Sequence, residues 1–378
     1  MLHTRLVFLF VSFLFLNLRK VVSFSMQTQI TNAQRTLRKL PEKVLVGYAT
    51  DCNEDVAKAV REGVNVVAWS FLDLRKLPDG SIVAETALDL DCIQQMISQL
   101  DFEGFNSTVH LISFGGWNGP HLDPDLTADD WYNSWKGKVG GIFHGIDWDL
   151  EGHNNLDNPT NSFSIECLDK MGCISRLARE DGYIIGMAPP QSYLDVDSPN
   201  FSRQVNLTEP GRPWHSEFHY FGANVYAYIL AKYGDYIDFI SIQFYESYSR
   251  AAMAYHYYGI SKQEYLERYV EELVKKGHSY LVNFDEDPSL NYPSRQVSVP
   301  LSKLVFGFAN GWALDSGDKA IFFEPGYIEV AYRNLCISGK APRGFMFWVI
   351  GEEGKHGVFY ARELNKILKS RGDVIQEV

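Results

Sequence analysis

An eight-residue stretch, Gly145–Gly152, constrains this chain more than any other part of it. Its acidic residues, Asp147, Asp149 and Glu151, stand at every second position, so in a β-strand all three side chains point to one face. Large apolar residues alternate with them and point to the other face: Ile146, Trp148 and Leu150. The apolar face needs a hydrophobic layer. The acidic face must line a polar space, because a buried carboxylate without a purpose costs several kcal/mol.

An alternative interpretation is an edge strand whose acidic face is simply solvated. The glycines that bracket the run favour the interior strand, because Gly152 marks an abrupt strand end just where the third carboxylate stands.

Eight apolar runs along the chain have the length and composition of buried strands. They cover residues 43–49, 64–72, 108–113, 141–151, 183–189, 236–245, 303–309 and 344–349. Helical patterns follow the runs. Asn53 is a predicted N-cap, Ser261 and Glu264 form a capping-box pattern, and Pro325 suits a helix start. Eight such units predict a (β/α)8 TIM barrel. A doubly wound open sheet is the alternative.

The first 25 residues resemble a secretory signal peptide. His3 and Arg5 precede an apolar run, residues 6–18, and a small-x-small site follows at 23–25. An uncleaved anchor is the alternative, although the run is shorter than the ~20 residues of a membrane span. Residues 26–40 are expected to be a flexible lead-in, and residues 41–372 a single folded domain that contains the barrel. We therefore expect a protein of the secretory lumen or exterior, with no stable membrane insertion after cleavage.

The composition indicates which classes of binding partner to expect. The formal net charge is −12 and no basic stripe is present, so nucleic acid is not an expected partner. Aromatic residues make up 14% of the chain, which suits sugar stacking. No cofactor is implied, and the cysteines have no C-x-x-C metal spacing. Cys167 and Cys173 are close enough to bridge a small loop, but pairing among the five cysteines cannot be deduced. Three N-x-S/T sequons fit a secretory route: Asn106, Asn200 and Asn206.

The segment from His144 to Glu151 resembles the DGxDxDxE signature of family 18 glycoside hydrolases, the chitinases and their relatives. Seven of its eight positions are compatible, and His144 replaces the first acidic residue. The resemblance implies that Glu151 protonates the glycosidic oxygen. It also implies that the 2-acetamido group of the substrate attacks the anomeric carbon. Asp149 would stabilise the resulting oxazolinium ion, and Asp147 would support Asp149.

Other segments resemble the family's motifs too. Ser113, Gly115 and Gly116 fit the SxGG motif of the third strand, although alone they would suggest only a glycine turn. The remaining matches imply substrate-binding residues Met187, Gln243 and Trp348, and a catalytic Tyr245 whose hydroxyl holds the acetamido carbonyl. A tyrosine in a strand is otherwise usually a core residue. By strand alternation, Trp348 and Met346 should face the barrel interior, and Phe345 and Phe347 the helices.

The chain departs from the family's pattern in two ways. Only about 15 residues separate Ala309 from Pro325, which leaves no room for the larger α+β subdomain often inserted there, so we expect a shallow, open cleft. His144 differs in parity from Asp147 and should face the helix layer or the start of the strand, where its cost should be modest.

The leading hypothesis is a secreted hydrolase of β-1,4-linked N-acetylglucosamine polymers, a chitinase. An endo-β-N-acetylglucosaminidase acting on N-glycans would use the same acid. A catalytically silent carbohydrate-binding protein on the same barrel is the third interpretation. Such relatives usually lose the glutamate that this chain keeps as Glu151.

Overall fold

The computed structural model describes residues 38–155, 157–205, 223–317 and 320–370. The expected signal peptide, most of the expected lead-in, the Asn206 sequon and residues 371–372 of the expected domain lie outside these ranges. The last residues of the lead-in belong to the folded body. Arg38 is only 6% exposed and pairs with Asp101 at 2.5 Å. No helix in the described ranges is both long and apolar enough to cross a membrane.

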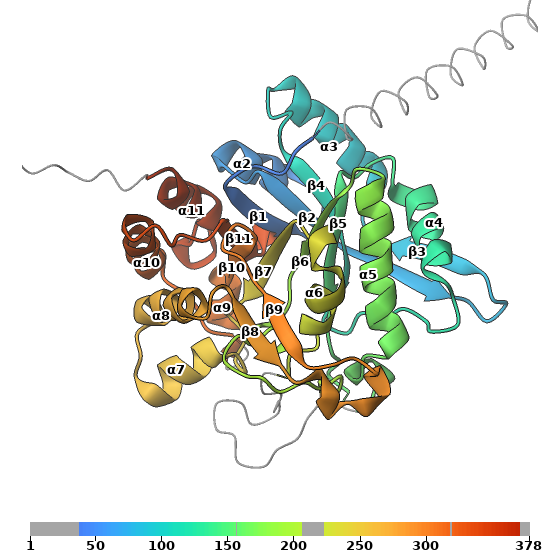
Figure 1. The fold of residues 1–378 in the computed structure, drawn as a ribbon. Helices are drawn as coiled ribbons and strands as arrows, with labels where there is room; N and C mark the ends of the chain where they lie inside the picture. Colours follow the sequence, from blue (N-terminus) through green and yellow to red (C-terminus); the bar gives the residue numbers. More distant parts are fainter. Residues whose placement is uncertain (1–37, 156, 206–222, 318–319, 371–378) are drawn as a thin grey trace, which may run out of the picture.

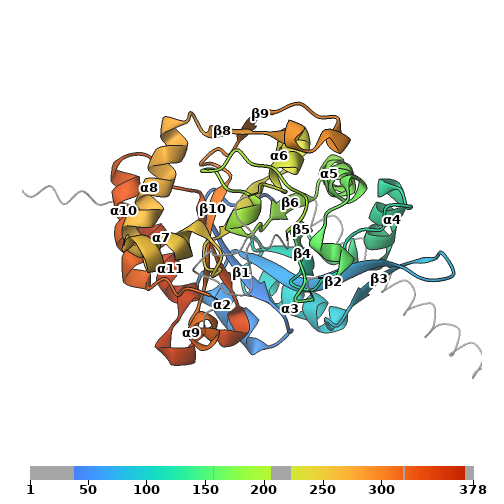
Figure 2. The same cartoon turned by 90° about the horizontal axis from the view of Figure 1, so that it is seen from below.

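Eight parallel strands close into a barrel, which confirms the predicted architecture (Figures 1 and 2). The first strand pairs with both the second and the last, and these pairings close the sheet. The barrel strands in chain order are β1 (Val44–Ala49), β2 (Val66–Lys76), β4 (Val109–Gly116), β5 (Gly145–Leu150), β6 (Ile184–Met187), β7 (Phe239–Gln243), β10 (Leu304–Ala309) and β11 (Gly344–Trp348). Each overlaps one of the eight predicted runs.

Helices cover the outside of the barrel (Figure 2). They are α2 (Glu54–Glu62), α3 (Leu90–Phe102), α4 (Ala128–Val139), α5 (Ile165–Glu180), α6 (Ala227–Tyr233), α8 (Lys262–Lys275), α10 (Pro325–Ile337) and α11 (Tyr360–Lys369). The predicted N-cap side chains are present, but in the described residues the Ser261–Glu264 capping box lacks its reciprocal bond, because Glu264 pairs with Arg268 instead. The Asn53 side chain accepts the Asp55 N–H at 3.0 Å, and Ser261 Oγ accepts the Glu264 N–H at 3.1 Å. Such caps satisfy N–H groups that the first helical turn leaves unpaired.

Strand alternation divides the apolar residues into two cores. The larger core lies between the barrel and its helices and contains the outward residues of each strand, such as Trp148 of β5 and Phe345 of β11. The smaller core fills the barrel interior and contains Val46, Leu111 and Met346. The carboxylates of β5 lie on the interior side, so they are surrounded by other strands rather than by bulk water.

Several short elements were not predicted. A strand β3 (Ile82–Thr86) pairs antiparallel with the extension of β2. A two-stranded hairpin, β8 (Ser279–Val282) and β9 (Arg295–Ser298), lies outside the barrel beside α6. Two short helices follow barrel strands: α7 (Arg250–Tyr258) and α9 (Gly311–Asp315). Between β10 and α10 the described residues contain only α9 and loops, which confirms that the large insertion subdomain is absent.

One disulfide joins Cys52, after β1, to Cys92, in the first turn of α3. The small loop considered for Cys167 and Cys173 does not form, and both are free thiols on α5. Six residues along a helix rise about 9 Å, beyond the ~7 Å that a disulfide can span between Cα atoms. Cys336 is also free.

Gly145 makes a close approach between strands possible. A Cβ atom at this position would lie 1.9 Å from the main-chain oxygen of Ile184 on β6. We therefore predict that Gly145→Ala destabilises the protein by at least ~3 kcal/mol, because β5 and β6 would have to separate. The measurement is denaturant unfolding. Gly137→Ala, in α4 with no neighbour within 4 Å, is the matched control and should be neutral or stabilising. Equal effects of the two substitutions would contradict this interpretation.

Candidate active site

The three acidic side chains of the Gly145–Gly152 stretch line the barrel interior in a row, and we call them the carboxylate row. Asp147 is 2% exposed, Asp149 4% and Glu151 5%. Because Glu151 directly follows the last residue of β5, it stands nearest the carboxyl ends of the strands. Barrel enzymes build their active sites at this end. The alternative of a solvated edge strand is therefore wrong, since β5 pairs with β4 and β6.

Asp147 lies deepest and has two hydrogen-bond donors. Tyr48 Oη and Ser113 Oγ donate to its Oδ2 at 2.6 and 2.8 Å. Gly186 on β6 leaves space beside it, because a Cβ there would lie 2.7 Å from Asp147 Oδ1. Burial raises the pKa of Asp147 to about 6, although both hydrogen bonds favour the ionised form.

Asp149 and Glu151 share one amide donor. Gln243 Nε2 lies 2.9 Å from Asp149 Oδ1, 3.5 Å from Glu151 Oε1 and 2.7 Å from the main-chain oxygen of Ala188. Burial, followed by the charges of Glu151 and Asp147, raises the pKa of Asp149 well above its usual value. Burial raises the pKa of Glu151 to about 7. Because two buried carboxylates this close resist ionising together, the pair retains a proton near neutral pH.

Glu151 keeps one oxygen for a ligand. Its Oε2 atom is buried and has no hydrogen-bond partner among the described residues. Unpaired buried carboxylate oxygens are costly, so such an atom marks a functional position. The main chain around it is held in place. His121 Nε2 lies 2.8 Å from the Glu151 carbonyl oxygen, and Tyr226 Oη donates to the Leu150 carbonyl at 2.9 Å.

Trp348, at the end of β11, and Tyr245, two residues beyond the end of β7, both lie on the interior side of the barrel, as predicted. Trp348 is half-buried and stacks on Phe71 with ring centres 6.0 Å apart, and Tyr48 lies 5.7 Å away. Phe345 and Phe347 pack outward against the helices. Tyr245 is buried, and burial together with the charge of Glu246 raises its pKa well above the ordinary value. Its phenol therefore stays protonated and can donate a hydrogen bond.

The glycines of the Ser113–Gly116 segment shape the site rather than present side chains to it. Gly115 and Gly116 have φ values of 100° and 75°, which favour glycine. A Cβ on Gly115 would lie 2.8 Å from the Asp149 carbonyl oxygen, and one on Gly116 would lie 2.4 Å from the Phe71 ring. They allow the end of β4 to lie against β5 and beneath Phe71. Ser113 reaches the carboxylate row directly through Asp147.

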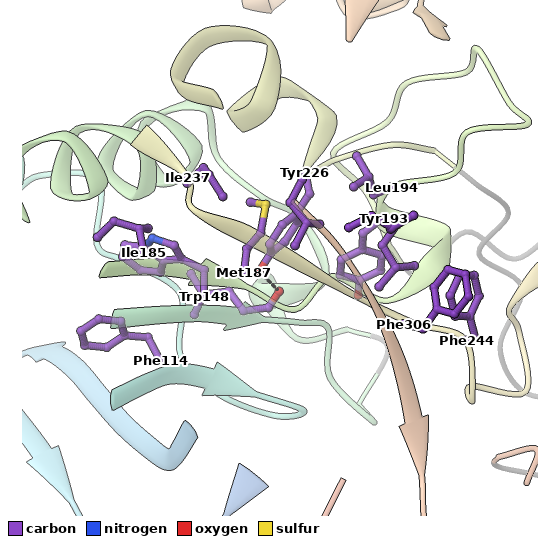
Figure 3. Packing of buried hydrophobic residues seen from close by; sticks show 14 of the residues in the cluster. Phe114, Trp148, Ile185, Met187, Tyr193, Leu194, Tyr226, Ile237, Phe244 and Phe306 are labelled. Carbon is purple, nitrogen blue, oxygen red and sulfur yellow. Dashed lines mark hydrogen bonds between the residues drawn. The ribbon is translucent and has the colours of Figure 1, made fainter. Parts of the chain in front are cut away.

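Met187 does not line the site, which corrects the prediction for this residue. Its side chain lies in the outer core with Trp148 and Tyr226, as Figure 3 shows. Met187 pairs in register with Trp148, so both share the outward face. The interior position of β6 is Gly186, directly beside Asp147. The motif match identified the correct strand but not the residue that faces the carboxylates.

His144 occupies the start of β5 and faces outward, as predicted. Its N–H donates to the His110 carbonyl at 2.7 Å, and its Nδ1 accepts the His110 N–H at 2.8 Å. The imidazole thus provides an acceptor that joins β5 to β4. Burial lowers the pKa of His110 to about 3, so that ring stays neutral at ordinary pH.

Tyr48 and Glu246 also belong to the site, although the sequence did not predict them. Tyr48 shares its interior face with Val44 and Val46, so the alternation of β1 could have revealed it. Glu246 lies beyond the end of β7, where alternation no longer indicates direction. Burial and the charge of Glu151 raise the pKa of Glu246 well above its usual value, and its Oε2 atom has no partner among the described residues. Within the same ranges, no group of three His, Cys, Asp or Glu side chains could hold a metal ion.

Solved structures with the same fold include family 18 (GH18) proteins. A GH18 chitinase from Chromobacterium violaceum aligns with TM-score 0.57 and 17% identity over 88% of this chain and 84% of its own. A fungal endo-β-N-acetylglucosaminidase of the same family aligns with TM-score 0.53 and 15% identity over 88% and 99%. A xylanase and α-amylase inhibitor protein from Scadoxus multiflorus aligns with TM-score 0.52 and 14% identity over 86% and 98%. The chain therefore has a GH18 chitinase-like fold. No family model and no curated protein matches its sequence.

The raised pKa of Glu151 predicts a pH-dependent stability effect. As pH rises from about 4.5 to 7, this carboxyl ionises in the unfolded chain but not in the folded one, so folding is progressively disfavoured. Glu151→Gln removes this loss. The variant should match the wild type below pH 4.5 and exceed it by ~1–3 kcal/mol at pH 8. The measurement is chemical denaturation across that pH range.

Glu103→Gln provides the control, because hydrogen bonds from Arg61 hold the pKa of that exposed carboxyl down to about 2. It should give no gain at pH 8. A Glu151→Gln variant that is no more stable than the wild type at pH 8 would show that Glu151 ionises as easily in the folded protein as in the unfolded chain.

Proposed function

We propose that this protein is a glycoside hydrolase that cleaves β-1,4-linked N-acetylglucosamine in chitin or chito-oligosaccharides. The observation that carries the proposal is Glu151. It is buried next to the carboxyl ends of the strands, has a pKa of about 7 and keeps one oxygen without a partner. A general acid needs a proton near neutral pH and an oxygen that no other protein group occupies, and in the described part of the chain Glu151 meets both needs.

In the proposed reaction, Glu151 gives its proton to the glycosidic oxygen while the bond to the anomeric carbon breaks. The acetamido oxygen of the same sugar attacks that carbon from the opposite side and forms an oxazolinium ion. Asp149 turns toward the acetamido N–H and stabilises the cation, while Asp147 maintains the hydrogen bonds behind it. Glu151, now ionised, takes a proton from a water molecule as that water attacks the anomeric carbon and opens the oxazolinium ring. The anomeric carbon is inverted twice, so its configuration is retained.

Three interior side chains support substrate positioning. Tyr245 Oη would donate to the acetamido carbonyl, which polarises it for attack. Trp348 would place its indole under the apolar face of the same sugar. Gln243 Nε2 donates to Asp149 at 2.9 Å and lies 3.5 Å from Glu151, so it orients Asp149 beside the proton donor. Gly186, rather than Met187, leaves room beside Asp147.

The same proposal includes passage through the secretory route. The N-terminal signal pattern and the sequons support it. So does the Cys52–Cys92 disulfide, because such bonds persist in oxidising compartments. N-glycan cleavage and sugar binding without cleavage remain as competing outcomes of the assay below.

The decisive assay incubates purified protein with chitin oligomers, fully deacetylated chitosan and a high-mannose glycopeptide, with products measured by mass and by NMR. We expect cleavage of chitin oligomers with β-anomer released first, and no cleavage of chitosan, which lacks the acetamido nucleophile. Glu151→Gln should lower the rate by ~10²–10⁴-fold while binding persists. Initial α-anomer would rule out the mechanism. Cleavage of the glycopeptide alone would identify the endo-acting alternative, and binding without cleavage would identify the silent one.

Trp348→Ala tests whether the indole of Trp348 stacks against the apolar face of the bound sugar. In the Glu151→Gln background it should weaken oligosaccharide binding by ~1–3 kcal/mol, by analogy with the stacking of other flat groups on aromatic rings. Calorimetric titration measures the role of Trp348 in sugar binding, and a melting curve measures its role in core packing. Phe102→Ala, an 89% exposed aromatic residue on α3, serves as the control and should leave affinity unchanged. A large drop in melting temperature with unchanged affinity would make Trp348 a core residue.

A further inference from the structure

A concave site lies on the flank of the barrel, away from the candidate active site. It has a volume of about 370 Å³ and lies between the β8–β9 hairpin, the end of α8 and residues 196–199 of the connection after β6. Figures 1 and 2 show the hairpin on the outside of the barrel, beside α6. We call this site the flank slot. None of the candidate active-site residues lines it.

One wall of the flank slot is a free strand edge. The Val299 N–H donates to the His278 carbonyl at 2.8 Å, just before the β8–β9 ladder begins. Hydrogen-bonded pairs alternate along an antiparallel ladder, so Tyr280 and Val282 bond to β9. The N–H and C=O groups of Ser279 and Leu281 therefore point away from β9. In the described part of the chain they have no hydrogen-bond partner.

The opposite wall shows which way this edge faces. The Asn283 N–H, the next outward group after Leu281, donates to the Pro199 carbonyl at 2.7 Å. The edge therefore faces residues 196–199. Two side chains hold that wall in place. Lys276 Nζ donates to the Val196 carbonyl at 2.9 Å, and Asn224 Nδ2 donates to the Ser198 carbonyl at 2.8 Å.

The side chains of the flank slot add a largely apolar surface with no net charge. Leu281 is 47% exposed, and Gln296 lies opposite it on β9. The one cation, Lys276, also pairs with Asp197 at 3.2 Å, so the two charges offset each other. Exposed strand edges are usually protected by lysine, proline or a bulge. The sequence of β8, Ser-Tyr-Leu-Val, contains no such protection.

We propose that the flank slot binds an extended segment of another protein, which adds to β8 as a further strand. Main-chain groups of Ser279 and Leu281 would supply the hydrogen bonds, and Leu281 would contact an uncharged apolar side chain of the segment. Because residues 196–199 face this edge across a slot of about 370 Å³, the proposed occupant is a single extended chain rather than the hairpin of a second copy. A protein segment fits better than a sugar, because Tyr280, the aromatic residue among the described residues that line the slot, is only 4% exposed and offers little surface for stacking.

Leu281→Pro tests the proposed main-chain bond with little disturbance. The Leu281 N–H takes no part in the β8–β9 ladder, and proline is tolerated where a strand's N–H faces outward. Leu281→Val keeps the N–H and is the matched control. The probe is a short blocked peptide of alternating threonine and valine, titrated into the full chain and followed by the amide NMR signals of residues 279 and 281.

We expect saturable binding that shifts these signals. Leu281→Pro should weaken it by about tenfold, the effect of losing one or two main-chain hydrogen bonds, and Leu281→Val by about twofold at most. A peptide methylated at its main-chain nitrogens should bind as weakly to the wild type, which keeps the test valid if Leu281→Pro misfolds. Glu151→Gln should bind the peptide normally.

Three results would overturn the proposal. The first is that Leu281→Pro and Leu281→Val bind the peptide with equal affinity. The second is that the wild type binds the methylated and unmethylated peptides equally well. The third is that the wild type shows no binding at millimolar peptide. Sedimentation supplies one further check. Concentration-dependent dimers that Leu281→Pro abolishes would show that the edge pairs with a second copy instead.

Discussion

The site depends on the desolvation of three carboxyl groups that lie two residues apart on one strand. Water would keep their pKa values near 4, and the closed barrel removes most of it. Hydrogen bonds from the protein replace only part of the lost hydration of these carboxyl groups. Asp147 receives two hydrogen bonds, while Asp149 and Glu151 share the Nε2 donor of Gln243. Hydrogen bonding thus decreases along the row, and the carboxyl with the weakest hydrogen bonding, Glu151, lies nearest the carboxyl ends of the strands, where its proton can be used.

The barrel fold offsets the free-energy cost of burying the three carboxyl groups. The outward side chains of β5 pack in the outer core, so burial of Ile146, Trp148 and Leu150 helps to offset the cost of the acidic face. Glycines at 145 and 186 let the neighbouring strands approach, and Gly186 also leaves space beside Asp147. Parts of the connections after β6 and β7 do not line the active site. They lie on the flank of the barrel and form the flank slot.

Much of this could be predicted from the sequence, because a strand's alternation determines which side chains face inward. It correctly predicted the carboxylate row, the interior position of Trp348 and the outward position of His144. It failed where alternation was not applied or does not hold. Met187 was chosen by motif although its register with Trp148 turns it outward, and Glu246 lies beyond the strand end. The Cys52–Cys92 disulfide joins the loop after β1 to the first turn of α3, and spacing along the chain alone cannot reveal this pairing.

The most direct test of the central claim is a titration of Glu151 itself. Carbon-13 NMR of protein labelled at its glutamate carboxyl carbons would follow each group, and the signal that is missing in Glu151→Gln identifies this one. A barrel interior that keeps Glu151 protonated predicts a transition near pH 7. A transition near the ordinary glutamate value of ~4.3 would mean that the residue is ionised at neutral pH, and it would contradict the assignment of Glu151 as the proton donor.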